Sequence, residues 1–298
     1  MVHGGSVTLN TYSAEQGAGE GPGKVGTCLK GIADNNFVPS LNALGSCFPA
    51  PQLGVGQRYI IMNTWDDFED EARLVEKTTC EQEPEIVGLM KDSIGIFVDG
   101  FSAAKGSDSS DEALAKMSLL SHSFGTLKCS VDTALRGYYV QSMNLLRIVY
   151  ENWIAYKYLE KNPDKAILWI RPSKRNKPPG HAAMLQEIDD DYIPLKGKMK
   201  GWHKTLCSFA HTDPLNLLAQ ISMVEVPSEI SIHFGATYKK DLFRTSAYSI
   251  CLWAGISIMN VGSWVPENDQ WHKQMVTVQE KILKFIEQEN KDFKLKNA

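Results

Sequence analysis

The sequence lacks the short motifs that identify common nucleotide-binding and hydrolytic sites. Its 298 residues contain no P-loop, no GxSxG nucleophile elbow and no HExxH zinc motif. The Gly-rich run at 17–26 follows no strand pattern and precedes no close helix, so we do not interpret it as a dinucleotide loop. We therefore predict no cofactor, and no reaction can be assigned by motif alone.

Paired cysteines and a strong excess of one charge are also missing. The six cysteines are scattered and form no CxxC pair, which favours reduced thiols in a cytoplasmic protein. The net charge of −4 and the pI near 6.0 argue against a protein that coats nucleic acid, although a local basic patch is allowed. The N-terminus has no basic region followed by an apolar run, which disfavours a secretory leader.

Long hydrophobic runs are rare, and only the uncharged segment 245–265 is long enough to cross a bilayer. It contains several Ser residues, Asn260 and two Gly, so its apolarity is modest. One weak segment of this kind is more typical of a buried core helix than of a membrane span. We therefore expect no membrane association.

The chain divides into a Gly-rich arm and a helical domain. Residues 1–56 are rich in Gly, Ser, Asn and Pro and have no helical or strand period, which predicts a flexible arm. Residues 57–298 are predicted to form a single helical domain. Within it, the basic, Pro-rich stretch 171–180 (RPSKRNKPPG) is expected to be a loop and a candidate hinge or binding loop.

Apolar residues recur at helical spacing along most of the helical domain. Thr64 and Asp67 have the spacing of a capping box at the start of the first helix. Gly137 is expected to break or kink the helical pattern. The predicted fold is an all-α, multi-helix bundle with a small β-hairpin near 221–234. Helices are expected from about 65 to 77, from 84 to 101, from the end of the linker 105–112 to 135, and then from about 138 to 160, 181 to 188, 202 to 210, 238 to 262 and 267 to 291.

A charged pair lies beside the apolar stripe of the predicted helix 138–160. Arg147 and Glu151 are four residues apart and are surrounded by Leu, Val, Tyr and Trp. A partly buried charge is costly unless it is matched, so the pair serves either as a salt bridge that fixes helix packing or as part of a ligand or catalytic site.

Three possible ligating side chains follow at four-residue intervals, namely His203, Cys207 and His211. On one helix they would share a face, but a three-turn ladder cannot surround one tetrahedral zinc ion. Two of them could bind zinc with a carboxylate from elsewhere, so His203 and Cys207 are only weak metal candidates. His211 is also a candidate by itself, because a His at a helix C-terminus titrates near neutral pH.

Arg175 and His181 resemble the Arg-x(4–6)-His signature of HEPN-type ribonucleases. That resemblance implies that Arg175 would orient the scissile phosphate and that His181 would assist attack by the ribose 2′-hydroxyl. The two Pro and the Gly between them differ from the usual helical motif. A solvated basic loop is the alternative interpretation.

The run from Leu135 to Trp169, followed by LCSFAH at 206–211, resembles an uncharacterised family of bacterial all-helical proteins. In that family a Leu-Leu-Arg-x-x-x-Glu helix precedes a downstream Ser/His element. The resemblance covers about 110–260 and implies a polar cluster of Arg147, Glu151 and His211. The Ser208–His211 spacing is one residue shorter than in the family's element.

The main functional expectation is a cytoplasmic protein that binds a small ligand, a nucleotide or a partner through this polar cluster. One alternative is a HEPN-like, metal-independent ribonuclease that acts on RNA through Arg175 and His181, or through Arg147 and His211. The other is a non-enzymatic interaction module whose last helix pairs with a partner protein. The sequence does not decide between a monomer and a homodimer.

Overall fold

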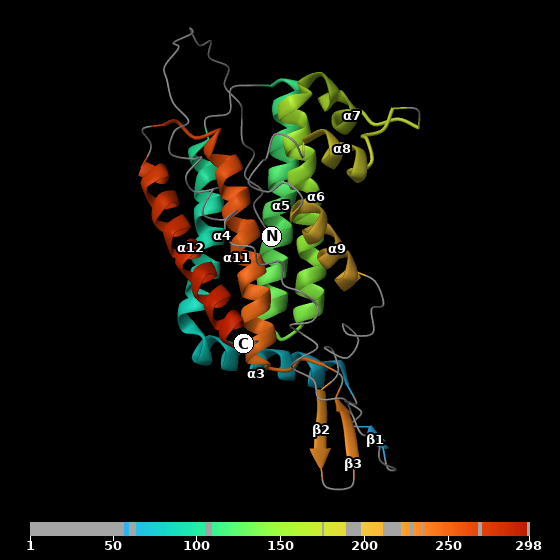
Figure 1. Ribbon diagram of the computed structural model, residues 1–298, viewed down its shortest axis with the longest axis vertical. Coiled ribbons are helices and arrows are strands. Elements are labelled where there is room, and N and C mark those ends of the chain that lie inside the picture. Colours follow the sequence, from blue (N-terminus) through green and yellow to red (C-terminus); the bar gives the residue numbers. More distant parts are fainter. Residues whose placement is uncertain are drawn as a thin grey trace, which may run out of the picture.

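The computed structural model describes residues 57–59, 64–104, 109–174, 176–188, 198–210, 222–226, 229–233, 235–267 and 270–296. The predicted arm at 1–56 lies outside the described residues. The described chain is predominantly helical, and the all-α fold predicted from the sequence is confirmed (Figure 1). The longer helices are α3 (Trp65–Gln82), α4 (Pro84–Ala103), α5 (Asp111–Leu135), α6 (Tyr139–Lys161), α11 (Lys240–Gly262) and α12 (Gln270–Lys296). The shorter elements are η1 (Pro163–Ala166), α7 (Ile167–Ile170), α8 (His181–Ile188) and α9 (Lys198–Ala210).

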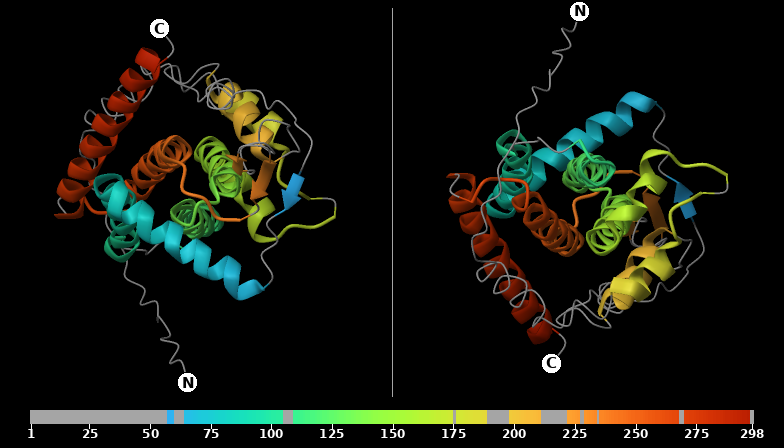
Figure 2. Two further views of the ribbon diagram at one scale, coloured as in Figure 1. Left: turned by 90° about the horizontal axis from the view of Figure 1, so that it is seen from below. Right: turned by 90° about the horizontal axis from the view of Figure 1, so that it is seen from above.

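The long helices pack side by side as a bundle, with α3 across one end. Helix α11 lies in the interior and contacts α4, α5, α6 and α12, while α5 and α6 form the closest helix pair. Helices α8 and α9 pack on the outer face of α6. The end-on views place α12 and α9 on opposite sides of the bundle (Figure 2). Helices α8 and α9 also contribute buried residues to the main core, namely Met184, Ile188, Trp202, Leu206 and Phe209.

Local sequence signals fix the helix starts. Thr64 accepts a hydrogen bond from the Asp67 backbone N–H, and the Asp67 carboxylate accepts one from the Thr64 N–H, so the predicted capping box is present. Helix α3 then continues to Gln82, beyond the end expected near Lys77. Ser110 caps α5 by accepting a hydrogen bond from the Ala113 N–H.

The turn between α5 and α6 depends on Gly137. Its φ is 83°, in the left-handed region that a residue with a side chain rarely adopts. Farther along this helix pair, the buried hydroxyls of Ser130 and Ser142 hydrogen-bond each other and the opposite backbone carbonyls. These small residues allow α5 and α6 to approach closely, and this approach sets the orientation of the outer face of α6.

Helix α11 is the segment that the sequence presented as a choice between a core helix and a membrane span. Among the described residues it is the one helix that is long and apolar enough to cross a membrane, with a mean hydropathy of 1.2. However, 83% of that window is buried inside the structure. Its apolar side chains therefore pack against the surrounding helices of the bundle.

The apolar stripe of α12 also faces the bundle. Val278, Ile282 and Ile286 are buried in the main core, and the Trp271 indole N–H donates to the Ile96 carbonyl of α4. The stripe that could have paired with a partner protein is thus largely occupied by α4 and α11.

A small sheet extends from the α3 end of the bundle (Figure 1). Strands β2 (Ser222–Val226) and β3 (Glu229–His233) pair antiparallel, with Ser222 opposite His233, in the region where the sequence predicts a hairpin. Strand β1 (Gln57–Tyr59) pairs parallel to β3. The sheet is an addition to the helical bundle.

Candidate functional site: a histidine cluster on helix α6

The Arg147–Glu151 pair predicted from the sequence forms on the outer face of α6. Arg147 Nε donates to Glu151 Oε1 over 2.8 Å. The two side chains are 32% and 37% exposed, so the pair is half-buried. This bond, reinforced by the Glu151 charge, raises the pKa of Arg147. The two Nη groups of Arg147 make no hydrogen bond within the described part of the chain, and they can receive an anionic partner.

Helices α8 and α9 bring the imidazoles of His181 and His203 to the outer face of α6. Helix α8 is anchored by the buried Met184 and Ile188, and α9 by apolar residues such as Leu206. This docking stacks the His181 ring on the His203 ring, with centroids 4.3 Å apart and an interplanar angle of 16°. Residues 22 positions apart in the sequence thus form one pair.

Tyr150 of α6 lies next to the stacked imidazoles. Its ring centroid is 5.2 Å from that of His181 and 5.7 Å from that of His203. On another side Tyr150 meets Trp253 of α11 edge to face, at 5.4 Å. Trp202 of α9 also contacts Trp253, at 6.0 Å. These buried rings provide a rigid aromatic base for the two histidines.

The thiol of Cys207 completes the group. Cys207 Sγ lies 3.3 Å from His203 Nε2, one turn along α9, and the thiol is half-buried. The charge of Cys207 is also one of the influences that raise the pKa of Arg147. We refer to Arg147, Glu151, His181, His203 and Cys207 together as the histidine cluster.

The electrostatics of the cluster favour neutral imidazoles. Burial has the largest effect on His181 and lowers its pKa. The neighbouring His203 and Arg147 lower this pKa further, while Glu151 opposes them. Burial likewise lowers the pKa of His203, with Arg147 adding to the effect and Glu151 opposing it. At neutral pH each ring therefore offers one N–H donor and one nitrogen acceptor. The Nε2 atom of His181 is buried and has no hydrogen-bond partner among the described residues.

The structure unites residues that the sequence had assigned to separate hypotheses. Arg147 and Glu151 came from the helix pattern, His181 from the ribonuclease-like motif, and His203 and Cys207 from the metal-like ladder. Arg175 and His211, the other two predicted residues, lie outside the described residues. No group of three metal-ligating side chains occurs within the described segments, and the stacked rings do not converge on a point where one ion could bind.

The sequence analysis did not predict the His181–His203 stack or the role of Tyr150. Both depend on how two short helices dock on α6, which the spacing of residues along one helix does not reveal. One signal was present in the sequence. Apolar residues, Tyr150 among them, flank Arg147 and Glu151 in the sequence, and the structure confirms that Tyr150 is fully buried beside these charges.

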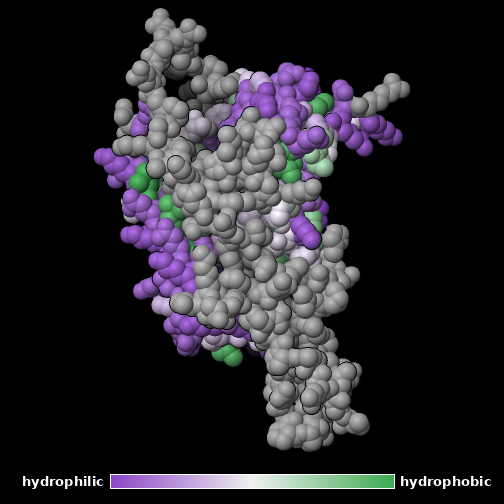
Figure 3. Space-filling model, viewed as in Figure 1, coloured by the Kyte–Doolittle hydropathy of each residue, from purple (hydrophilic) through white to green (hydrophobic). Residues whose placement is uncertain are grey.

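The stretch of sequence that carries His181, His203 and Cys207 is basic although the whole protein is acidic. Residues 161–210 contain ten Lys and Arg against five Asp and Glu, whereas the net charge of the whole chain is −4. The surface near α7 and the loop that follows it is mainly hydrophilic (Figure 3). A local excess of positive charge raises the concentration of anions near the site.

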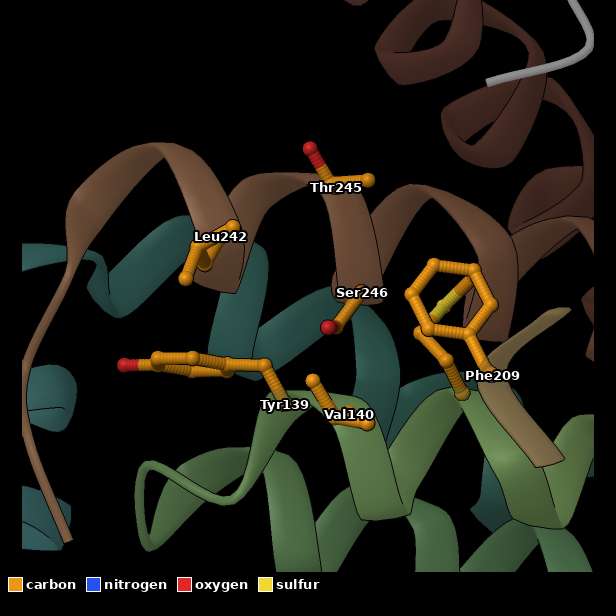
Figure 4. A pocket seen from close by; sticks show the side chains of 7 residues that line it. Tyr139, Val140, Phe209, Leu242, Thr245 and Ser246 are labelled. Atoms are coloured by element: carbon orange, nitrogen blue, oxygen red, sulfur yellow. The ribbon is translucent and has the colours of Figure 1, made fainter. Parts of the chain in front are cut away.

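An apolar pocket adjoins the cluster along α6. It is lined by Met143, one turn before Arg147, by Phe209 of α9, and by residues of α6 and α11 that include Tyr139 and Leu242 (Figure 4). Its enclosed volume is about 10 Å³, which is room for about one water molecule. This is far below the range of about 300–1,000 Å³ that is usual for drug-sized ligands.

Comparisons with known proteins give no relative for this chain. No protein-family model, no curated protein and no solved structure matches it. The functional argument therefore depends on the residues of the histidine cluster.

Proposed function

We propose that the histidine cluster binds a small anionic molecule that carries a phosphate group, of the nucleotide class. The main support is the convergence of Arg147, His181 and His203 from three helices onto one half-buried face. The Nη groups of Arg147 make no hydrogen bond within the described residues, and these groups and the neutral imidazole N–H groups are suitable donors for phosphate oxygens.

The environment supports the same ligand class. The excess of positive charge in 161–210 attracts anions. Glu151 fixes the guanidinium through Nε and leaves its other edge for the ligand.

Binding can be tested with the purified protein and Arg147→Gln. Calorimetry with inorganic phosphate, AMP and ATP should detect binding to the wild type that weakens as salt is added. We expect Arg147→Gln to lower the affinity about tenfold or more, because it removes a charge-assisted contact. Arg136→Gln is the matched control, since Arg136 is also a half-exposed, ion-paired arginine but lies at the turn after α5. Equal weakening by both variants, or no binding of any probe, would contradict the proposal.

A ribonuclease is a second candidate, favoured by the neutral imidazoles next to Arg147. A neutral imidazole can accept the proton of a ribose 2′-hydroxyl while the guanidinium stabilises the charge that develops on the phosphate. The test is cleavage of single-stranded RNA by wild type, His181→Ala and His203→Ala in the presence of EDTA. Loss of cleavage in one histidine variant would support the enzyme. Cleavage that is unchanged in both would indicate a contaminating nuclease.

A further inference from the structure

Cys207 and His203 form a pair that anion binding does not require. Cys207 Sγ and His203 Nε2 are 3.3 Å apart on successive turns of α9, which is within hydrogen-bond distance for sulfur. In the tautomer with the ring proton on Nδ1, the thiol S–H donates to Nε2. The ring is held in this position by the stack on His181 and by Tyr150. A fixed acceptor at this distance from a thiol has the geometry of a base and a nucleophile.

The surroundings of the pair also suit a nucleophilic thiol. Cys207 is only half-buried, whereas Cys251 in the core of α11 is fully buried. The charges that face the pair from the neighbouring helices are Arg147 and Glu151 of α6, and His181 is contributed by α8. Arg147 lies near enough to Cys207 for the two groups to interact electrostatically.

We propose that Cys207 is a nucleophile, activated by His203 as general base, toward small electrophiles that carry an anionic group. In the step, Sγ attacks the electrophilic carbon, and its proton passes to His203 Nε2. The new carbon–sulfur bond forms as the bond to the leaving group breaks, and the leaving group departs with that electron pair. The preference for anionic electrophiles rests on the proposed function of Arg147, while the thiol–imidazole step does not.

Two alkylating reagents of opposite character provide the test. Iodoacetamide is neutral and iodoacetate is anionic, and both transfer a carbon to sulfur with loss of iodide. Rates are measured on the native full chain by mass spectrometry of each cysteine-containing peptide. The exposed Cys129 serves as the reference thiol in the same molecule, and the buried Cys251 reports unfolding because it should react only when the core opens.

At pH 7 we expect iodoacetamide to modify Cys207 roughly tenfold faster than Cys129, and His203→Gln to remove this advantage. His272→Gln is the matched control, because His272 is also a half-buried histidine but lies in α12, outside the histidine cluster. It should leave most of the advantage. A rate at Cys207 no faster than at Cys129, or equal losses in the two histidine variants with Cys251 still protected, would overturn the assignment.

The anionic preference is tested by the ratio of the iodoacetate rate to the iodoacetamide rate. This ratio should be higher at Cys207 than at Cys129, and Arg147→Gln should reduce it to the Cys129 value. An unchanged ratio in Arg147→Gln would overturn the preference.

Added AMP separates the two proposals. If AMP binds yet leaves the alkylation rate of Cys207 unaltered, AMP occupies another site and the proposed function fails. If AMP binds normally but Cys207 is alkylated slowly, only the proposal that Cys207 is a nucleophile fails.

Discussion

At the residue scale, the best-defined charge in the protein is Arg244 of α11, which joins two carboxylates from distant parts of the chain. Its Nη1 donates to Glu83, at the junction of α3 and α4, over 3.0 Å, and its Nε donates to Glu289 of α12 over 3.0 Å. The Glu83 side chain is only 5% exposed, so its charge depends on these partners. Lys240 also approaches Glu83, at 3.3 Å, from the solvent side.

Replacing Arg244 with Met should destabilise the fold by about 3 kcal/mol, because it removes the best-placed cation of the buried Glu83 and leaves it the exposed Lys240 and the Tyr238 hydroxyl among the described residues. Urea denaturation at pH 7 measures this change in the free energy of unfolding. The control is Lys281→Met, which removes an exposed pair with Asp92 and should cost less than about 1 kcal/mol. Similar losses in both variants would show that Glu83 is not held by Arg244.

At the element scale, the turn that reverses the chain between α5 and α6 fixes the position of the histidine cluster. Gly137 has a positive φ, and a Cβ added to it would lie 2.8 Å from the backbone N and O of Thr237 and 2.9 Å from Val75 Cγ1. The turn is therefore locked between α3 and the segment that leads into α11. A change at this position alters the relative placement of three elements.

Gly137→Ala should lower the free energy of unfolding by about 2 kcal/mol or more, since backbone strain and a steric clash act together. Gly125→Ala is a control of opposite sign. Gly125 lies within α5 with open space around the added Cβ, so alanine should stabilise by about 0.5–1 kcal/mol. Thermal and urea unfolding of both variants provide the measurement. Stabilisation by Gly137→Ala would show that the turn is not constrained as described.

The sequence predicted the elements better than their contacts. Helical periodicity, the Thr64 cap and the break at Gly137 identified most helices and their order, because these signals act within a few residues of chain. The Arg147–Glu151 pair followed from a four-residue spacing on one helix. The stack of His181 on His203 did not, since it depends on the docking of α8 and α9 on α6, and no local pattern encodes that distance.

At the scale of the whole molecule, the bundle has a well-connected core and a peripheral layer. Helix α11 is surrounded by four long helices, whereas the described contacts of α8 and α9 are mainly with α6, and Trp202 links α9 to Trp253 of α11. Layers with few partners open at lower free energy than the core. The α8–α9 layer also carries both stacked histidines, so its attachment should depend on pH.

The sign of this pH dependence follows from the lowered pKa values of His181 and His203. An unfolded histidine titrates near its ordinary pKa of about 6.5, and the folded rings titrate below it. The contribution of the two neutral rings to the free energy of unfolding is therefore fully present above about pH 6.5. It is lost as the pH falls from there through the pKa values of the folded state. Protonation would also place a positive charge on stacked rings beside Arg147, with Glu151 as the nearby counter-charge.

We therefore expect the backbone amides of α8 and α9 to lose protection from hydrogen exchange at pH 5 before those of α11 do. Urea denaturation at pH 7.5 and pH 5 measures the corresponding change in global stability. Other carboxylates titrate in this range as well, so the decisive quantity is the difference between wild type and His181→Gln. That variant keeps the packing volume but removes one titrating ring, and its stability should fall less on acidification. A parallel fall in both proteins would show that the stacked pair does not control the attachment of this layer.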